Sequence, residues 1–170
     1  MWIDDNPENN SDRVAFAEYM GVTVFTLMST ASAKAWIDAN EGKTLQFFSS
    51  TMQSNAMTPT EHLRRRDDNC QLRFITDNAR WESHIAQGRS KLELSAGEAI
   101  LRFLRGRQYK APVLVCTNKS LPSTSYVLEY ERCGSTTSNI VCLAYIASLA
   151  YAVDHDRRWE KFGAWHGTRA

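Results

Sequence analysis

The residues of this sequence that could do chemistry are carboxylates and hydroxyls at the ends of apolar segments. Asp4 and Asp5 stand side by side after the opening apolar run, and Asp77 ends the segment QLRFITD. Thr117 follows the apolar segment APVLVC. Adjacent carboxylates repel each other unless solvent, a cation or a proton relieves the repulsion. The aspartate pair therefore indicates either a cation site or a cap for the helix that follows.

Such oxygen donors suit phosphoryl chemistry with Mg²⁺. This cation prefers a few oxygen ligands plus water, and it would neutralise carboxylates that otherwise repel each other. With the cation bound, one aspartate can attack phosphorus and form an acyl phosphate. A hydroxyl at Thr117 would then hydrogen-bond a phosphoryl oxygen. This chemistry requires the aspartates and Thr117 to converge at one place in the fold.

The elements expected from the sequence bring these residues together. Strand-like segments alternate with segments of helical apolar spacing, which predicts a three-layer α/β sandwich with right-handed crossovers. We expect a flavodoxin-like parallel sheet of five strands in the order 2-1-3-4-5. In such folds ligands bind beyond the carboxyl ends of the strands, where Asp4, Asp5, Asp77 and Thr117 all fall.

Particular segments are expected to form each element. Residues 21–29 have the composition of a buried strand, and residues 78–94 that of a polar loop. Ser29 or Thr30 is expected to cap a helix, and Ser95 and Glu98 have capping-box spacing. The expected strands cover residues 2–4, 21–29, 71–77, 111–118 and 134–141, and the expected helices cover 6–20, 30–40, 95–109, 121–132 and 141–153.

One domain is expected over residues 1–152, because a chain of 170 residues fits a single hydrophobic core. Residues 41–69 break the alternation with polar residues and an RRRDD run, and we predict an insertion outside the core. The C-terminal tail, 153–170, carries three aromatic residues at helical spacing. These aromatics are expected to pack back on the domain.

Composition excludes several functional classes. The formal net charge is +1, with 43% hydrophobic and 23% charged residues, so neither a nucleic-acid nor a membrane surface is predicted. No apolar run approaches the ~20 residues that span a bilayer, and the N-terminus lacks a signal-peptide layout. We therefore expect a cytoplasmic protein. Its four cysteines show no CxxC spacing and are expected to be reduced thiols.

Three stretches resemble the receiver domains of two-component response regulators: IDDNPEN after the first strand, FITD at the end of the third, and PVLVCT in the fourth. The resemblance implies that Asp4, Asp5 and Asp77 hold Mg²⁺. It also implies that Asp77 accepts a phosphoryl group and that Thr117 is the switch hydroxyl. A signalling role follows, with a histidine kinase or phosphotransfer protein as the expected partner.

The sequence departs from the receiver pattern at the fifth strand. Receivers place a lysine followed by proline there, whereas the stretch GSTTSNIV holds no lysine. Lys119, two residues after Thr117, is the candidate substitute. The expected outcome is either a receiver that uses another cation or a pseudo-receiver that has lost the chemistry.

Two other functions stay open at this point. TIR-type domains share the flavodoxin-like layout, and some cleave NAD with a glutamate that follows a central strand. Here Trp81 and Glu82 follow the third expected strand. The other alternative is a non-catalytic interaction module, in which the acidic pocket is vestigial and the helical and C-terminal surfaces bind a partner.

Overall fold

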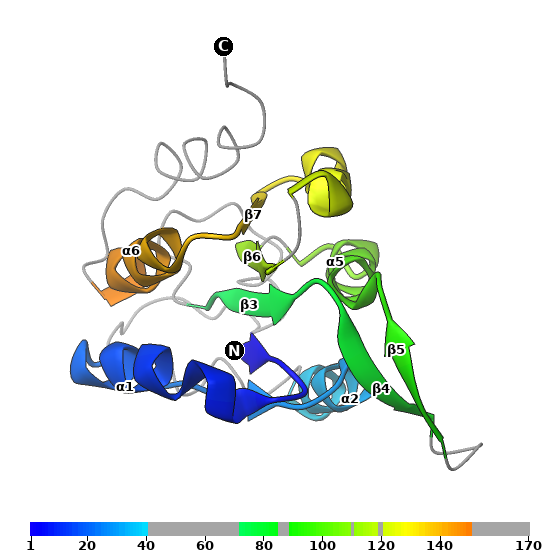
Figure 1. Ribbon diagram of the computed structural model, residues 1–170, viewed down its shortest axis with the longest axis horizontal. Coiled ribbons are helices and arrows are strands. Elements are labelled where there is room, and N and C mark those ends of the chain that lie inside the picture. Colours follow the sequence, from blue (N-terminus) through cyan, green and yellow to red (C-terminus); the bar gives the residue numbers. More distant parts are fainter. Residues whose placement is uncertain (41–71, 85–88, 110, 119–120, 151–170) are drawn as a thin grey trace, which may run out of the picture.

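Five parallel strands form the central sheet of the protein, in a computed structural model that describes residues 1–40, 72–84, 89–109, 111–118 and 121–150 (Figure 1). The strands of this sheet are β1 (Trp2–Ile3), β2 (Thr26–Leu27), β3 (Phe74–Asp77), β6 (Val113–Cys116) and β7 (Cys133–Thr136). Their order is β2-β1-β3-β6-β7, and every neighbouring pair is parallel. The predicted flavodoxin-like α/β fold and its strand order are confirmed.

Helices cover both faces of the sheet and make the three layers. One face carries α1 (Ser11–Tyr19) and α6 (Asn139–Ala150), and the other carries α2 (Thr30–Asn40) and α5 (Ala96–Gly106) (Figure 1). Within the described residues, the 3₁₀ helix η1 (Pro7–Asn10) leads into α1, and the 3₁₀ helix η3 (Leu121–Glu129) packs on β7. The central strands therefore meet apolar side chains on both sides.

Side chains along the central strands alternate between two cores, as the two-residue period of a strand requires. The residues that pack with α1 and α6 are Trp2, Ile75 and Leu114. The residues that pack with α2 and α5 are Ile3, Phe74, Val113 and Val115. Burial on both faces explains why these strands are nearly continuous apolar runs in the sequence.

Strand β2 is shorter and more exposed than predicted. The sequence predicts a buried strand over 21–29, whereas only Thr26–Leu27 pair with β1. Thr26 is exposed and Leu27 is half-buried. The prediction of burial is wrong because β2 is an edge strand, and strand propensity does not report a strand's place in the sheet.

The segment predicted as a polar loop contains a β-hairpin, formed by β4 (Arg80–His84) and β5 (Arg89–Glu93) in antiparallel pairing (Figure 1). The loop prediction for 78–94 is wrong because charged side chains occupy the buried positions of β4 and an apolar side chain occupies an exposed one. Arg80 and Glu82 are buried, while Trp81 between them is 56% exposed. A search for apolar residues on the buried face does not detect such a strand.

Helix starts follow the sequence in one case and depart from it in another. The Ser29 hydroxyl accepts a hydrogen bond from the Ser32 amide at 3.0 Å, at the start of α2 as expected. The capping box predicted for α5 does not form, because Ser95 bonds Glu93 instead and Glu98 pairs with Arg102 on the helix surface. The helix expected at 121–132 is present as η3, a 3₁₀ helix rather than an α-helix.

Two predictions lie outside the described residues: the insertion at 41–69 and the packing of the tail at 153–170. Among the residues that the structure describes, no helix has the length and apolar character needed to cross a bilayer. All strands of the main sheet lie between residues 1 and 150.

Candidate functional site

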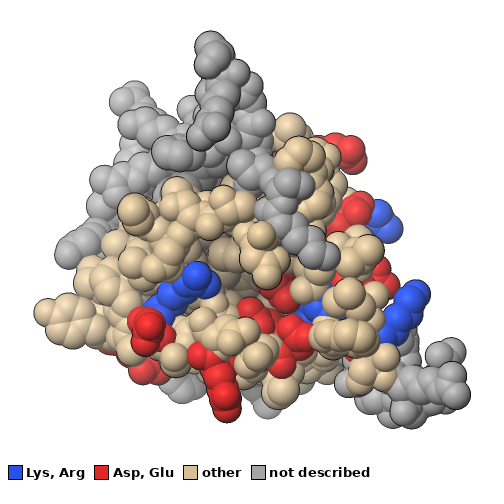
Figure 2. All heavy atoms as spheres, in the orientation of Figure 1, with Lys and Arg blue, Asp and Glu red and all other residues tan. Residues whose placement is uncertain are grey.

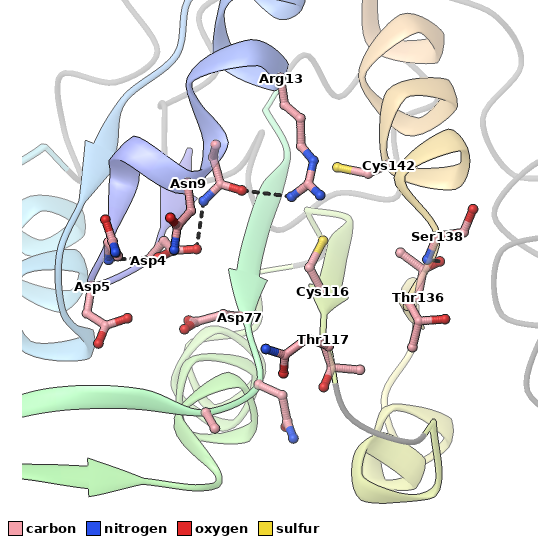
Figure 3. A pocket seen from close by; sticks show the side chains of 16 residues that line it. Asp4, Asp5, Asn9, Arg13, Asp77, Cys116, Thr117, Thr136, Ser138 and Cys142 are labelled. Carbon is pink, nitrogen blue, oxygen red and sulfur yellow. Dashed lines mark hydrogen bonds between the residues drawn. The ribbon is translucent and has the colours of Figure 1, made fainter.

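A cavity of about 370 Å³ lies at the carboxyl edge of the sheet. Asp4, Asp5, Asp77 and Thr117 all line it (Figure 3). On the face of the molecule drawn in Figure 2, acidic side chains gather beside a hollow. The structure therefore brings together the four residues that the sequence singles out, and their surroundings decide what they can do.

The three aspartates each direct a carboxylate oxygen toward the others, and these oxygen atoms all lie within 4.8 Å of one another. The register of the sheet explains this proximity. Ile3 of β1 pairs with Thr76 of β3, so Asp4 and Asp77 follow side by side at the same edge. Three carboxylates this close repel one another, which favours binding of a proton or a cation.

Asp4 and Asp5 also have structural contacts. Asp4 Oδ1 accepts a hydrogen bond from the Asn6 amide at 2.8 Å, and Asp4 Oδ2 accepts one from Asn10 Nδ2 at 2.7 Å. The Asn6 amide belongs to the N-cap residue of η1 and no side-chain hydrogen bond caps this helix, so the cap expected from the aspartate pair does not form. Asp5 Oδ2 accepts a hydrogen bond from the Trp81 amide at 2.9 Å, which ties the acidic pair to β4.

The surroundings of Asp77 raise the pKa of its carboxyl group. Burial raises its pKa from 3.8 to about 7, Arg80 opposes this rise, and the charges of Asp4 and Asp5 add to it. Arg80 Nη1 donates to Asp77 Oδ1 at 2.6 Å. Among the described residues no other side-chain or backbone group donates to this carboxylate, so its second oxygen, Oδ2, is left for a ligand.

Arg80 is a fully buried guanidinium that joins several elements beneath the cavity. Its Nη1 donates to the Ile3 carbonyl at 3.0 Å and to Thr76 Oγ1 at 2.9 Å. Its Nε donates to Glu82 Oε1 at 2.9 Å. Asp77 and Glu82 thus balance its charge, as a buried cation requires. The sequence signal that could have found it is the charged alternation Arg80, Glu82 directly after Asp77.

Glu82, the candidate glutamate of the NAD-cleaving alternative, belongs to β4, and its side chain contacts Thr30 at the start of α2. Its two carboxylate oxygens accept hydrogen bonds from the Thr30 amide at 2.8 and 3.0 Å, and Oε1 accepts another from the Thr30 hydroxyl at 2.5 Å. A carboxylate at this position accepts a hydrogen bond from a backbone N–H of the first turn of α2, and its negative charge interacts favourably with the helix dipole. Among the described residues, the wall of the cavity does not include Glu82.

Hydroxyl groups line the side of the cavity away from the acidic pair (Figure 3). The Thr117 amide donates to the Thr136 carbonyl at 3.0 Å, which places Thr117 beside the end of β7. Thr136, Thr137 and Ser138, at and just after the end of β7, also line the cavity. Lys119, the substitute considered from the sequence, lies outside the described residues.

Arg13 supplies the positive charge on the cavity wall that the sequence analysis missed. Among the described lining residues it is the one lysine or arginine. Its Nη1 donates to Asn10 Oδ1 at 2.7 Å and its Nε donates to Asn139 Oδ1 at 2.6 Å, so the guanidinium is held between α1 and α6. The spacing of Asn10 and Arg13, which puts both on one helix face, is the signal that could have found it.

The cavity thus combines a carboxylate cluster with a guanidinium and several hydroxyls. Such a set can bind a hard cation on one side and an anion with several oxygens on the other. No protein-family model matches this chain, and no curated protein is significantly similar to it. The function is therefore inferred from the chemistry of the cavity.

Proposed function

We propose that this chain is a receiver-like signalling domain in which Asp77 accepts a phosphoryl group in the presence of Mg²⁺. The observation that carries the proposal is the approach of the Asp4, Asp5 and Asp77 oxygens to within 4.8 Å of one another at the carboxyl edge of a flavodoxin-like sheet. The resemblance of the same sequence stretches to response-regulator receivers supports it.

The donor set fits a hard divalent cation. Carboxylate oxygens are the ligands that Mg²⁺ prefers. Burial is the main cause that raises the pKa of Asp77 to about 7; Arg80 opposes the rise, the charges of Asp4 and Asp5 add to it, and a bound cation would favour the ionised form. Asp4, Asp5 and Asp77 would hold the cation. When bound, it would supply charge neutralisation for an incoming phosphoryl group.

Asp77 would perform the covalent step. Arg80 holds Oδ1 at 2.6 Å and so fixes the orientation of the carboxylate. Oδ2 then attacks the phosphorus of the donor: a bond from oxygen to phosphorus forms, and the bond to the leaving group breaks with its electron pair. The attack requires an ionised carboxylate, and with a pKa of about 7 Asp77 is substantially ionised at neutral pH.

Arg13 and Thr117 would take up the negative charge of the phosphoryl group. Guanidinium groups pair well with phosphoryl oxygens, and Asn10 and Asn139 already hold the Arg13 side chain in place on the cavity wall. The Thr117 hydroxyl would donate to another phosphoryl oxygen. The charge that receivers take from a lysine on the fifth strand would thus come from α1.

The phosphodonor expected for such a domain is a histidine kinase or a phosphotransfer protein, and both would place it in the cytoplasm. A small phosphodonor permits the direct test. After incubation with acetyl phosphate and Mg²⁺, the wild-type chain should gain one phosphoryl group that hydroxylamine removes, as measured by intact mass. Acyl phosphates have this lability, whereas phosphate esters do not.

The matched variants locate the acceptor. Asp77→Asn should lose the modification, and Asp12→Asn, which alters an exposed carboxylate on α1, should keep it. The proposal is wrong if the wild type gains no phosphoryl group with Mg²⁺ present, or if Asp77→Asn gains one at the same rate.

Binding without phosphoryl chemistry is the second candidate, and the hairpin favours it. Trp81 and Leu92 are register partners across β4 and β5, and they are 56% and 39% exposed. The Trp81 amide also contacts Asp5, so this apolar pair is joined to the acidic cluster. Mg²⁺ binding without phosphoryl acceptance would favour this role. The hydrogen bonds that occupy Glu82 give no comparable support to NAD cleavage.

A further inference from the structure

The β4–β5 hairpin has an open strand edge. The hairpin is a sheet of two strands that extends away from the main sheet, and β5 is its outer strand (Figure 1). The other edge, along β4, is occupied at Trp81, whose amide donates to Asp5 Oδ2 at 2.9 Å. In the part of the chain that the structure describes, β5 pairs with β4 alone. An edge of this kind is a template on which another strand can pair.

The contact between Trp81 and Asp5 also shows which backbone groups of β5 face the open edge. Opposite residues of an antiparallel pair exchange either two hydrogen bonds or none. Trp81 and its partner Leu92 exchange none, because the Trp81 amide is directed to Asp5. The amide and the carbonyl of Leu92 therefore point out of the hairpin, and so do those of Ser90, two residues earlier.

Side chains along β5 alternate between an apolar face and a charged face. Leu92 shares the exposed face of the hairpin with its partner Trp81, and Leu94, just past the strand, is 58% exposed. Lys91 and Glu93 lie on the opposite face, where Lys91 is exposed and Glu93 is half-buried. The edge thus carries one positive and one negative charge, two residues apart, behind an exposed apolar face.

We propose that the open edge of β5 docks on β5 of a second copy of this chain, in antiparallel pairing about a two-fold axis at Leu92. The outward amide and carbonyl of Leu92 in each copy then exchange two hydrogen bonds with those of the other copy. Trp81 and Leu92 of both copies form one apolar stripe across a sheet of four strands. This dimer goes beyond the proposed phosphoryl chemistry, because it needs neither Mg²⁺ nor a phosphodonor.

Charge complementarity selects both the register and the second copy as the occupant. With the axis at Leu92, Lys91 of each copy stands opposite Glu93 of the other, so two pairs of opposite charge form. A shift of the axis by one residue, to Lys91 or to Glu93, would oppose two like charges. A lysine on an edge strand usually prevents pairing, and Glu93 removes this obstacle in one register only. A second copy carries the matching charges at the matching positions.

The expected interface is small, because each copy contributes one strand edge and one apolar pair. Interfaces that bury less than about 1,200 Å² belong to weak or transient complexes. We therefore expect a reversible dimer, whose fraction rises with the concentration of the chain.

Sedimentation velocity of the full-length chain, without Mg²⁺ or a phosphodonor, should show a monomer–dimer equilibrium. The outcome is therefore independent of whether Asp77 accepts a phosphoryl group. A carbodiimide, which joins amines directly to carboxylates, then locates the contact in an equal mixture of ¹⁴N-labelled and ¹⁵N-labelled chains. Cross-linked peptides of mixed isotope should join Lys91 to Glu93, and the mixed isotopes separate these links from links within one chain.

Charge-reversal variants test the register. Lys91→Glu and Glu93→Lys should each weaken self-association by about tenfold, because each variant opposes like charges across the axis. An equal mixture of the two variants should associate as well as the wild type, because each charge then faces its opposite. Glu18→Lys, a reversal on the exposed surface of α1, should have no effect. Circular dichroism checks that each variant is folded, since Glu93 also accepts a hydrogen bond from the Ser95 hydroxyl.

The wild-type measurements decide the question even where a variant does not fold. The proposal is overturned if the wild type stays monomeric up to its highest soluble concentration, or if the mixed-isotope links join other residues and never Lys91 to Glu93. It is also overturned if the mixture of folded Lys91→Glu and Glu93→Lys chains associates no better than either variant alone. An effect of Glu18→Lys equal to that of Glu93→Lys would mean that net charge, and not pairing at β5, controls association.

Discussion

Asp77 is a carboxyl group that folding moves out of water. Its pKa rises from 3.8 to about 7, chiefly through burial, so between these values the folded chain binds a proton that the unfolded chain has released. Stability therefore falls as pH rises from about 4 to about 7, and the penalty is complete above the folded pKa. The burial of Asp77 thus predicts a free energy of unfolding that decreases as the pH rises through this range.

Asp77→Asn removes that cost while its amide oxygen can still accept from Arg80. Near pH 4 the variant should match the wild type, and above pH 7 it should be more stable by about 1–3 kcal/mol, as urea unfolding across pH would measure. Asp12→Asn, on the surface of α1, should show no such trend. A variant that is less stable at every pH would mean that the ion pair with Arg80 outweighs the burial.

At the scale of elements, the β4–β5 hairpin is joined to α2 through one carboxylate. Glu82 accepts from the Thr30 amide and balances the buried Arg80. Glu82→Gln keeps the shape but loses the charge, so it should lower the free energy of unfolding by about 1–3 kcal/mol. Thermal unfolding would measure the loss. Glu18→Gln, an exposed change on α1, should have little effect, and equal effects would contradict the role of Glu82.

The approach of α5 to the sheet depends on a glycine. A Cβ at Gly97 would lie 2.6 Å from the Tyr126 hydroxyl and 3.0 Å from the Asp77 carbonyl, whereas a Cβ at Gly106 of the same helix would meet nothing within 4 Å. Gly97→Ala should therefore destabilise the protein by about 1–3 kcal/mol through overpacking. Gly106→Ala is the matched control and should be neutral or stabilising in the same chemical denaturation. A neutral Gly97→Ala would show that Tyr126 moves away without cost.

For the whole molecule, a cation at the acidic cluster should stabilise the entire fold, because its ligands come from strands far apart in the sequence. Binding to the folded state alone adds about 1.4 kcal/mol for each tenfold rise of Mg²⁺ above its dissociation constant. The melting temperature of the wild type should therefore rise with millimolar MgCl₂. Asp5→Asn should abolish the rise, and Asp12→Asn should keep it.

Salt screening must be separated from this effect. NaCl at equal ionic strength weakens the repulsion among Asp4, Asp5 and Asp77 without binding at a defined site. An equal shift in NaCl and MgCl₂, or no shift in the wild type, would contradict a Mg²⁺ site. Tryptophan fluorescence provides a second readout, because the Trp81 amide contacts Asp5.

The sequence by itself determined the sheet and the convergence of Asp4, Asp5, Asp77 and Thr117. Parallel strands buried on both faces are continuous apolar runs, and such runs are visible without coordinates. Residues that follow those runs must share one edge, because the strands of a parallel sheet end on the same side. These four cavity residues could therefore be located in advance, and their roles stay proposals.

Only the tertiary structure decided which charges are buried and which groups face the cavity. Arg80 and Glu82 belong to a segment whose polarity predicts a loop, yet both are buried. Arg80 pairs with Asp77 at the end of β3, and Glu82 accepts a hydrogen bond from the amide of Thr30, which is distant in sequence. Arg13 and Cys142 reach the cavity from the two helices on one face of the sheet. Local patterns reflect average solvation, whereas a buried charge depends on partners that only the folded chain brings within contact.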